Sequence, residues 1–443
     1  MPHYTKDRTL SRKIEDYLDN GFTSNATSSA TSTSTAFDGF GRARVAEPYT
    51  LFDSQHRYVE NNKWNNSLSG TGASTYVENE SAVNLTAPAG AGTVIRQSNV
   101  VFPYQPGKSL LLMYSFSFST AVLTNSKTVT QKIGYFNADN GIFLEQTNGA
   151  PNAVTPRNGG GLRLVLRSDS VTAGTGSSVD FAVEQANWNG DKFNGTGTSG
   201  RTLDVSKANI FWMDIEWLGV GDVRCGFIVD GKMVVAHTFH NDNLNATSYM
   251  TTAVLPIRYE LTNTGTTSPY VKQICNTVIS EGGFNPTSIT YNQLASTNIS
   301  NANLRIAATD GLFYNVVSIR LTTGKTDGII IPTDVELLGE SNKSYQWALL
   351  RNATFGTAPT WATHAHCATT EFTTSVSTIT GGVLVKTGYF TSNSGSVGAT
   401  IAGDIALQLG RTIAGVSDTY TVAITSTGTN TKYTGSLAWY QII

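Results

Sequence analysis

The chain has 443 residues, of which 30 are Lys or Arg and 32 are Asp or Glu, so its formal net charge is −2. Only 14% of the residues are charged, whereas an ordinary soluble domain carries roughly 25%. A net charge so close to zero argues against nucleic acid and anionic membranes as partners, and the sequence lacks the run of about 18 apolar residues that membrane insertion needs.

The N-terminal segment, residues 1–35, predicts a short helix followed by an extended arm. Apolar residues recur at helical spacing within 6–19, and Asn20-Gly21 is a typical stop signal. Residues 23–35 are mostly Ser and Thr, which cannot bury apolar surface by themselves. We therefore expect an extended, linker-like arm here. We see no apolar stretch of a secretory signal in this segment.

Short strand-like runs begin after residue 36. Examples are 109–120, 210–218 and 223–229, in which apolar residues are continuous or alternate with polar ones. Such runs follow one another at spacings of about ten residues, with Asn-Gly, Asp-Gly and Gly-Gly turns between them. This pattern predicts an all-β fold, with an antiparallel sandwich of the jelly-roll or lectin-like type over 36–285.

The sequence becomes polar and rich in Asn over 286–302, and we interpret these residues as a linker. Strand-like runs resume beyond it, so 303–443 is expected to form a second, smaller β-sandwich. Apolar and polar residues alternate again over 435–443. We expect this last strand to be anchored in a core or an interface.

Three cysteines, Cys225, Cys275 and Cys367, lie far apart and form no CxxC pair. We expect them to be reduced, buried thiols, and we expect no cofactor. Asp191 and Asp204 lie among Asn-rich turns, but the spacing of a calcium loop is absent, so Asx turns are favoured.

The strand-like run 211–217 carries two carboxylates, and alternation places Trp212, Asp214 and Glu216 on one face. Two carboxylates beside an aromatic ring are typical of sugar-cleaving enzymes. We favour the alternative that this face is a solvent-exposed polar stripe, and we assign no catalytic residue.

A His-x-His pair, His364 and His366, is expected to share a strand face. On a three-fold axis, three such pairs offer six imidazole nitrogens to a transition metal. We favour the alternative of a solvated surface pair, and therefore predict no metal.

One long segment, AFDGFGRARVAEPYTLFDSQHRY, resembles the opening phrase FGRLRVSNPxTLFDS of a family of tailed-phage virion structural, or tail-fibre-like, proteins of marine and freshwater phages. Further segments similar to this family follow in the family's order, and together they are distributed over residues 36–355. The segments are residues 36–58, 101–112, 210–241, 255–266, 271–284 and 317–355.

This resemblance implies an accessory structural protein located in the virion, made in the cytoplasm of the host bacterium, with no enzymatic activity. The expected partners are further copies of the chain, in a homotrimer, and other virion proteins bound through 1–35. Fibre, capsid-decoration, neck and baseplate positions all remain open.

Two alternatives remain beside the structural role. In the first, the protein is a host-receptor module that binds a surface glycan, with Trp64, Trp188 and Trp361 as loop platforms that stack on sugar rings. In the second, it is a glycan depolymerase that uses Asp214 and Glu216.

Overall fold

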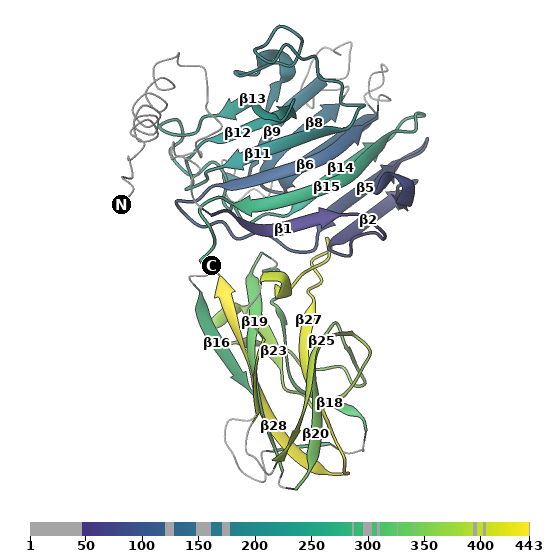
Figure 1. The fold of residues 1–443 in the computed structure, drawn as a ribbon, viewed down its shortest axis with the longest axis vertical. Coiled ribbons are helices and arrows are strands. Elements are labelled where there is room, and N and C mark those ends of the chain that lie inside the picture. Colours follow the sequence, from purple (N-terminus) through teal and green to yellow (C-terminus); the bar gives the residue numbers. More distant parts are fainter. Residues whose placement is uncertain are drawn as a thin grey trace, which may run out of the picture.

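A computed structural model describes most of the chain from residue 47 onward. The predicted N-terminal helix and arm lie outside the described residues, which are 47–119, 128–147, 161–170, 178–285, 288–295, 304–307, 311–325, 327–340, 342–392, 397–401 and 405–442. These residues form two β-sandwiches in series, with the smaller one below the larger one in Figure 1. The predicted all-β fold with two sandwiches is therefore confirmed.

The first sheet of the large sandwich runs in the order β13-β12-β11-β6-β15-β4-β3, and β1 also pairs with β15. All its pairs are antiparallel. The strands are β1 (Tyr49–Gln55), β3 (Ala73–Val77), β4 (Ala82–Thr86), β6 (Leu110–Phe118), β11 (Asn209–Ile215), β12 (Val223–Val229), β13 (Lys232–Phe239) and β15 (Tyr270–Ser280).

The second sheet packs against the first and runs in the order β10-β9-β8-β7-β14-β5-β2, again with antiparallel pairs. Its strands are β2 (Trp64–Gly70), β5 (Gly92–Ser98), β7 (Val129–Phe136), β8 (Gly141–Thr147), β9 (Gly161–Ser168), β10 (Val179–Glu184) and β14 (Ile257–Asn263).

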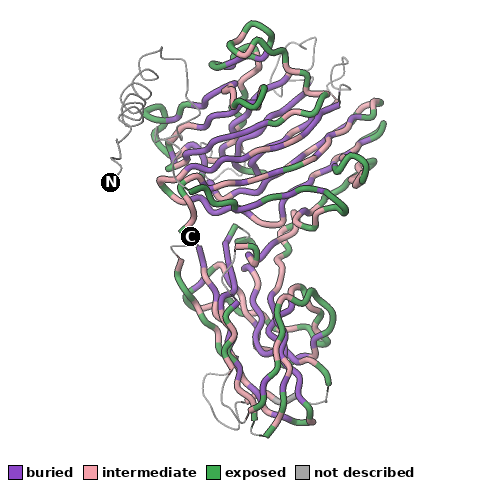
Figure 2. Tube along the Cα trace, viewed as in Figure 1, coloured by how far each residue is buried: buried purple, intermediate pink, exposed green. Residues whose placement is uncertain are grey.

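The core of the large sandwich lies between these sheets and is rich in aromatic rings. Strand β14 shows how the sequence builds it, because its residues are buried and half-buried in strict alternation. Tyr259 and Leu261 point inward and are fully buried, whereas Glu260 points outward. On β11, Met213 and Ile215 point into the same core. Figure 2 shows the buried residues along the middle of the sheets.

The small sandwich also consists of two antiparallel sheets. One contains β16 (Ile289–Leu294), β17 (Arg305–Ala307), β19 (Ile329–Gly339), β26 (Val397–Thr400) and β28 (Thr431–Ile442). The other contains β18 (Phe313–Leu321), β20 (Ser344–Arg351), β21 (Thr354–Phe355), β22 (Ala362–His364), β23 (Cys367–Thr373), β24 (Thr378–Thr380), β25 (Val383–Thr391) and β27 (Thr419–Ser426).

The prediction of a linker over 286–302 is wrong for part of this range, because β16 lies within it and pairs with β28. Polar residues occur here because β16 is an edge strand and is largely exposed. The expectation for the last strand is confirmed over its described residues. Strand β28 pairs on both sides, and its Leu437 and Trp439 are fully buried.

The two sandwiches meet through an apolar cluster that includes Val101 of the first and Ile329, Ile331 and Ile442 of the second. Beside this cluster, Gln408 Nε2 donates to the carbonyl oxygen of Val101 at 3.0 Å. A cavity of about 220 Å³ is lined by both sandwiches. The interface is therefore packed and hydrogen-bonded.

Candidate functional site

The outer face of the second sheet is unusually polar, and we call it the polar sheet face. Strand register aligns five charged residues of alternating sign side by side on neighbouring strands. In strand order from β10 to β14 they are Glu184, Arg163, Glu145, Lys132 and Glu260. Their sequence neighbours on β7, β8, β9 and β14 point into the core, so period-two alternation directs these groups outward.

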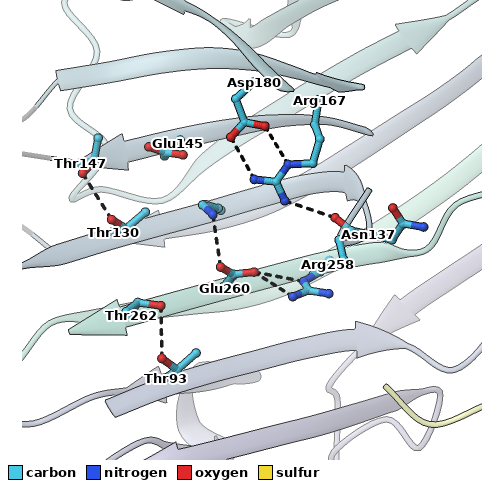
Figure 3. Close-up of polar contacts among 12 residues, drawn as sticks. Thr93, Thr130, Asn137, Glu145, Thr147, Arg167, Asp180, Arg258, Glu260 and Thr262 are labelled. Carbon is cyan, nitrogen blue, oxygen red and sulfur yellow. Dashed lines mark hydrogen bonds and ion pairs between the residues drawn. The ribbon is translucent and has the colours of Figure 1, made fainter. Parts of the chain in front are cut away.

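A second row on this face consists of hydroxyl groups. Thr93 and Thr262 lie with their Oγ1 atoms 3.3 Å apart, and so do Thr130 and Thr147. Thr262 is also the register partner of Thr130, so the four residues form one line across β5, β14, β7 and β8 (Figure 3). The face thus offers hydroxyls beside charged groups.

Glu260 is the centre of one ionic network on the face. Lys132 Nζ lies 3.2 Å from Glu260 Oε1, and Arg258 Nη2 lies 2.9 Å from Oε2. Burial works to raise the pKa of Glu260, but the charges of Lys132 and Arg258 outweigh it and lower the pKa below its ordinary value. The carboxylate is therefore ionised and fixed in position at neutral pH.

Two further ion pairs lie on the β8, β9 and β10 side of the face. Arg163 Nε donates to Glu145 Oε1 at 2.9 Å, and both side chains are only 4% exposed. Burial raises the pKa of Glu145, against the opposing charge of Arg163. Arg167 binds both carboxylate oxygens of Asp180, at 2.7 and 2.9 Å (Figure 3).

Two phenylalanine rings lie beneath the guanidinium groups of Arg167 and Arg258. The ring centres of Phe136 and Phe143 are 4.6 Å apart, and both residues are fully buried. Both nevertheless belong to the residues of β7 and β8 that point away from the core of the sandwich. The guanidinium carbon of Arg167 lies 5.1 Å from the centre of the Phe143 ring, and that of Arg258 lies 5.4 Å from Phe136. The cations are thus held by both carboxylates and rings.

Over the described residues, the formal charges of the polar sheet face balance. Four cations stand against four anions, and each cation lies within ion-pair distance of a carboxylate. An extended polyanion would need an excess of cations, so this face favours a ligand that is polar but uncharged. The eight residues are Lys132, Arg163, Arg167, Arg258, Glu145, Asp180, Glu184 and Glu260.

Strand β11 lies in the first sheet of the large sandwich. Its residues Met213 and Ile215 pack inward. This agrees with the prediction that Trp212, Asp214 and Glu216 share the other face. The predicted solvent exposure of this stripe is wrong. Asp214 is 1% exposed and Glu216 6% exposed, and Asp214 forms an ion pair with Arg224 of the adjacent strand. Burial raises the pKa of Glu216 to about 7.

The three tryptophans expected as sugar platforms have different surroundings. Trp64 is buried at the start of β2, where its Nε1 donates to Ser54 Oγ at 2.8 Å. Trp188 is 1% exposed, and its Nε1 donates to the backbone oxygen of Val183. Both were expected in loops, but core packing covers their rings. Trp361 remains partly exposed, with the guanidinium of Arg320 4.3 Å from its ring centre.

His364 and His366 do not share a strand face. His364 ends β22, whereas His366 is exposed in the turn before β23. The ring of His364 packs 5.2 Å from Trp439, so it belongs partly to the core of the small sandwich.

The sequence reasoning missed a group formed by Asp222, His240 and Asp242. Their ligand atoms lie within 4.8 Å of one another, and His240 Nδ1 is 2.7 Å from Asp222 Oδ2. Asp222 precedes β12 and the other two follow β13, so only the pairing of these strands reveals the group. All three residues are at least partly exposed, and we assign no ion to them.

The predictions for the cysteines and for Asp191 are confirmed in part. Cys225 and Cys367 are buried free thiols, as predicted, but Cys275 is exposed, because its side chain leaves the core at a β-bulge. Asp191 forms the predicted Asx turn, since its Oδ1 accepts from the N–H of Phe193 at 2.7 Å. Within the described residues, no helix is long and apolar enough to cross a membrane.

No protein-family model matches the chain, and no curated protein is similar to it in sequence. Among solved structures, the carbohydrate recognition domain of Emp47p is 9% identical, covering 53% of this chain and 97% of that domain, with a TM-score of 0.32. Peanut lectin is also 9% identical and covers 53% of this chain and 98% of the lectin, with a TM-score of 0.31. The alginate lyase AlyC3 is 9% identical over 46% of this chain and 78% of the lyase, with a TM-score of 0.29. Similarities this weak carry no information about the function of this chain.

Proposed function

We propose that the chain is a carbohydrate-binding surface component of a tailed-phage virion, and that the polar sheet face is its binding surface. The observation that supports glycan binding is the ordered array of hydroxyls and paired charges across neighbouring strands (Figure 3). Each of these groups is held by a neighbour, so binding to a polyhydroxylated ligand costs little side-chain entropy.

The accessible part of this face extends from β7 to the edge strand β2. The side chains of Lys132 and Glu260 are 14% and 16% exposed, the threonines of β5, β7 and β14 are half-buried, and Ser67 and Ser69 of β2 are exposed. A sugar chain that lies across these strands meets ammonium, carboxylate and hydroxyl groups in turn. These are the groups that donate to and accept from sugar hydroxyls.

The virion location is supported by the sequence resemblance of six segments within residues 36–355. A protein with 14% charged residues suffers little like-charge repulsion when copies pack around a symmetry axis. We accordingly propose a homotrimer that is joined to the particle through 1–35.

The glycan proposal is tested with an array of neutral and anionic glycans, together with the surface polysaccharide of the host bacterium. We expect binding to a neutral glycan and a clear loss of binding in Lys132→Met, which removes one partner of Glu260. Lys272→Met is the control, because Lys272 of the other sheet also forms a Lys–Glu ion pair, with the more exposed Glu80. Failure of every glycan to bind, or equal effects of both variants, contradicts the proposal.

The virion proposal needs separate measurements. Proteomics of purified particles and immunogold labelling should find the protein on the virion, and sedimentation equilibrium should give three times the monomer mass. A protein that is abundant in infected cells but absent from purified particles would be incompatible with this location.

A further inference from the structure

The small sandwich carries a second candidate binding site, on the outer face of the sheet that contains β20, β25 and β27. Strands β25, β20 and β27 are neighbours there, and their register forms two rows of three side chains. Thr391, Ser344 and Thr427 form the first row, and Tyr389, Gln346 and Thr425 form the second. We call this set the hydroxyl pocket, because four of its six side chains are hydroxyls of Ser or Thr.

A cavity of about 710 Å³ lies over these residues. Pockets that hold small organic ligands have volumes of about 300–1,000 Å³. Among the residues that the structure describes, none that lines this cavity is acidic, basic or histidine. A charged ligand would therefore lose its hydration without gaining an opposite charge, whereas an uncharged polar ligand would not.

Tyr389 is the most exposed aromatic residue of this pocket, with 77% of its surface accessible. Its neighbour Phe390 points the other way and stacks on Tyr345 in the core, with ring centres 4.9 Å apart. Packing of the sandwich therefore does not use the Tyr389 ring. A flat aromatic surface beside hydrogen-bonding groups suits a ligand with both an apolar and a polar face.

Thr425 supplies an independent sign of a missing partner. Its side chain lines the cavity and is 8% exposed, yet its Oγ1 has no hydrogen-bond partner among the residues that the structure describes. A buried hydroxyl without a partner is unfavourable and rare. A ligand hydroxyl in the pocket would satisfy it.

We propose that the hydroxyl pocket binds a neutral saccharide unit. The C–H face of the sugar ring lies on Tyr389, and its hydroxyls bond to the Gln346 amide, to Ser344 and to Thr425. This site lies on another sandwich than the polar sheet face, so the inference goes beyond the proposed function and does not depend on it.

The test uses full-length protein and a panel of neutral mono- and disaccharides of glucose, galactose, mannose and N-acetylglucosamine. Saturation-transfer NMR identifies binders, and calorimetry measures their affinity. We expect Tyr389→Ala to weaken the best binder by about tenfold or more. Tyr58→Ala is the matched control, because Tyr58 is 71% exposed on the large sandwich.

Thr425→Val separates binding from folding. Valine keeps the shape of threonine but removes the unpaired hydroxyl, so the melting temperature should stay the same or rise while saccharide affinity falls. A loss of affinity together with a lower melting temperature would mean that Thr425 stabilises the fold only, and would contradict its role in the pocket.

Lys132→Met distinguishes this inference from the proposed function. Saccharide binding that is lost in Tyr389→Ala and retained in Lys132→Met assigns the ligand to the hydroxyl pocket. Binding that responds only to Lys132→Met overturns the pocket and leaves the polar sheet face intact. If no sugar of the panel binds, or if Tyr389→Ala causes the protein to self-associate differently without affecting sugar binding, the saccharide assignment is wrong.

Discussion

Arg96 on β5 donates from Nε to Oε1 of Gln273 on β15 at 2.5 Å, and this hydrogen bond joins the two sheets of the large sandwich through its interior. The Arg96 side chain is fully buried, and its Nη1 also lies 2.6 Å from Glu60 Oε1. Burial lowers the pKa of Arg96, although the charge of Glu60 opposes this shift. The guanidinium is thus a polar link inside a core that is rich in aromatic rings.

Removing this link should destabilise the large sandwich. Arg96→Met leaves Gln273 and Glu60 without their partner, and we expect the free energy of unfolding in urea to fall by about 2–4 kcal/mol. Arg201→Met is the control, since Arg201 forms an exposed ion pair with Asp230 and its loss should leave the unfolding midpoint unchanged. Equal midpoints for the two variants would show that Arg96 does not stabilise the sandwich.

The raised pKa of Glu216 predicts a pH dependence of stability. Because its pKa is about 7 in the folded protein and about 4.5 when unfolded, the folded state favours the protonated form. This contribution is complete below about pH 4.5 and is lost as the pH rises to about 7. Glu216→Gln imitates the protonated form, so it should raise the free energy of unfolding at pH 8 by about 2–3 kcal/mol and leave it unchanged at pH 4.

Urea titrations at pH 4 and pH 8 measure this effect, with Glu80→Gln as the control, since Glu80 lies in a half-exposed ion pair. A Glu216→Gln variant that is no more stable than the wild type at pH 8 would mean that Glu216 is ionised without penalty.

The same variant tests the depolymerase alternative. Because Glu216 is 6% exposed, we expect incubation of the protein with host polysaccharide to leave the chain length unchanged by size-exclusion chromatography. Shortened chains that disappear with Glu216→Gln would instead establish the enzymatic reading.

His237 predicts the opposite pH trend. Burial, together with the nearby His240, lowers its pKa from 6.5 to about 4, so the folded state favours the neutral ring. The stability that depends on the neutral ring is complete above pH 6.5 and is lost as the pH falls to about 4. His237→Gln should therefore remove about 2–3 kcal/mol of acid destabilisation over this range, as measured by urea unfolding at pH 7 and pH 4.5. His366→Gln, in an exposed turn, should leave the acid sensitivity as it is.

The interface between the sandwiches predicts coupled unfolding. Ile331 is 1% exposed within the apolar cluster between them, so Ile331→Ala leaves a cavity there. We expect calorimetry to show one transition for the wild type and two separated transitions for the variant. Leu384→Ala on the exposed face of β25 should preserve the single transition. A single, merely shifted transition in Ile331→Ala would show that this cluster does not couple the sandwiches.

Local alternation predicted which face of a strand each residue occupies, but not what covers that face. Met213 and Ile215 were assigned to one face and do point into the core. Asp214 and Trp64 were expected to meet solvent, and both are buried. Burial depends on which strand or loop lies against a face, and those segments are distant in the sequence: Trp64 packs on Tyr259, for example.

The sequence by itself determined the all-β class, the two sandwiches and a chain with few charges, because turns and period-two alternation are local properties. Only the tertiary structure decided which side chains form a site. Lys132 meets Glu260, and Thr93 meets Thr262, through the register of strands more than a hundred residues apart. Tyr389, Gln346 and Thr425 become neighbours in the same way. Register is set by hydrogen bonds and core packing between distant strands, and the residues of one strand do not specify it.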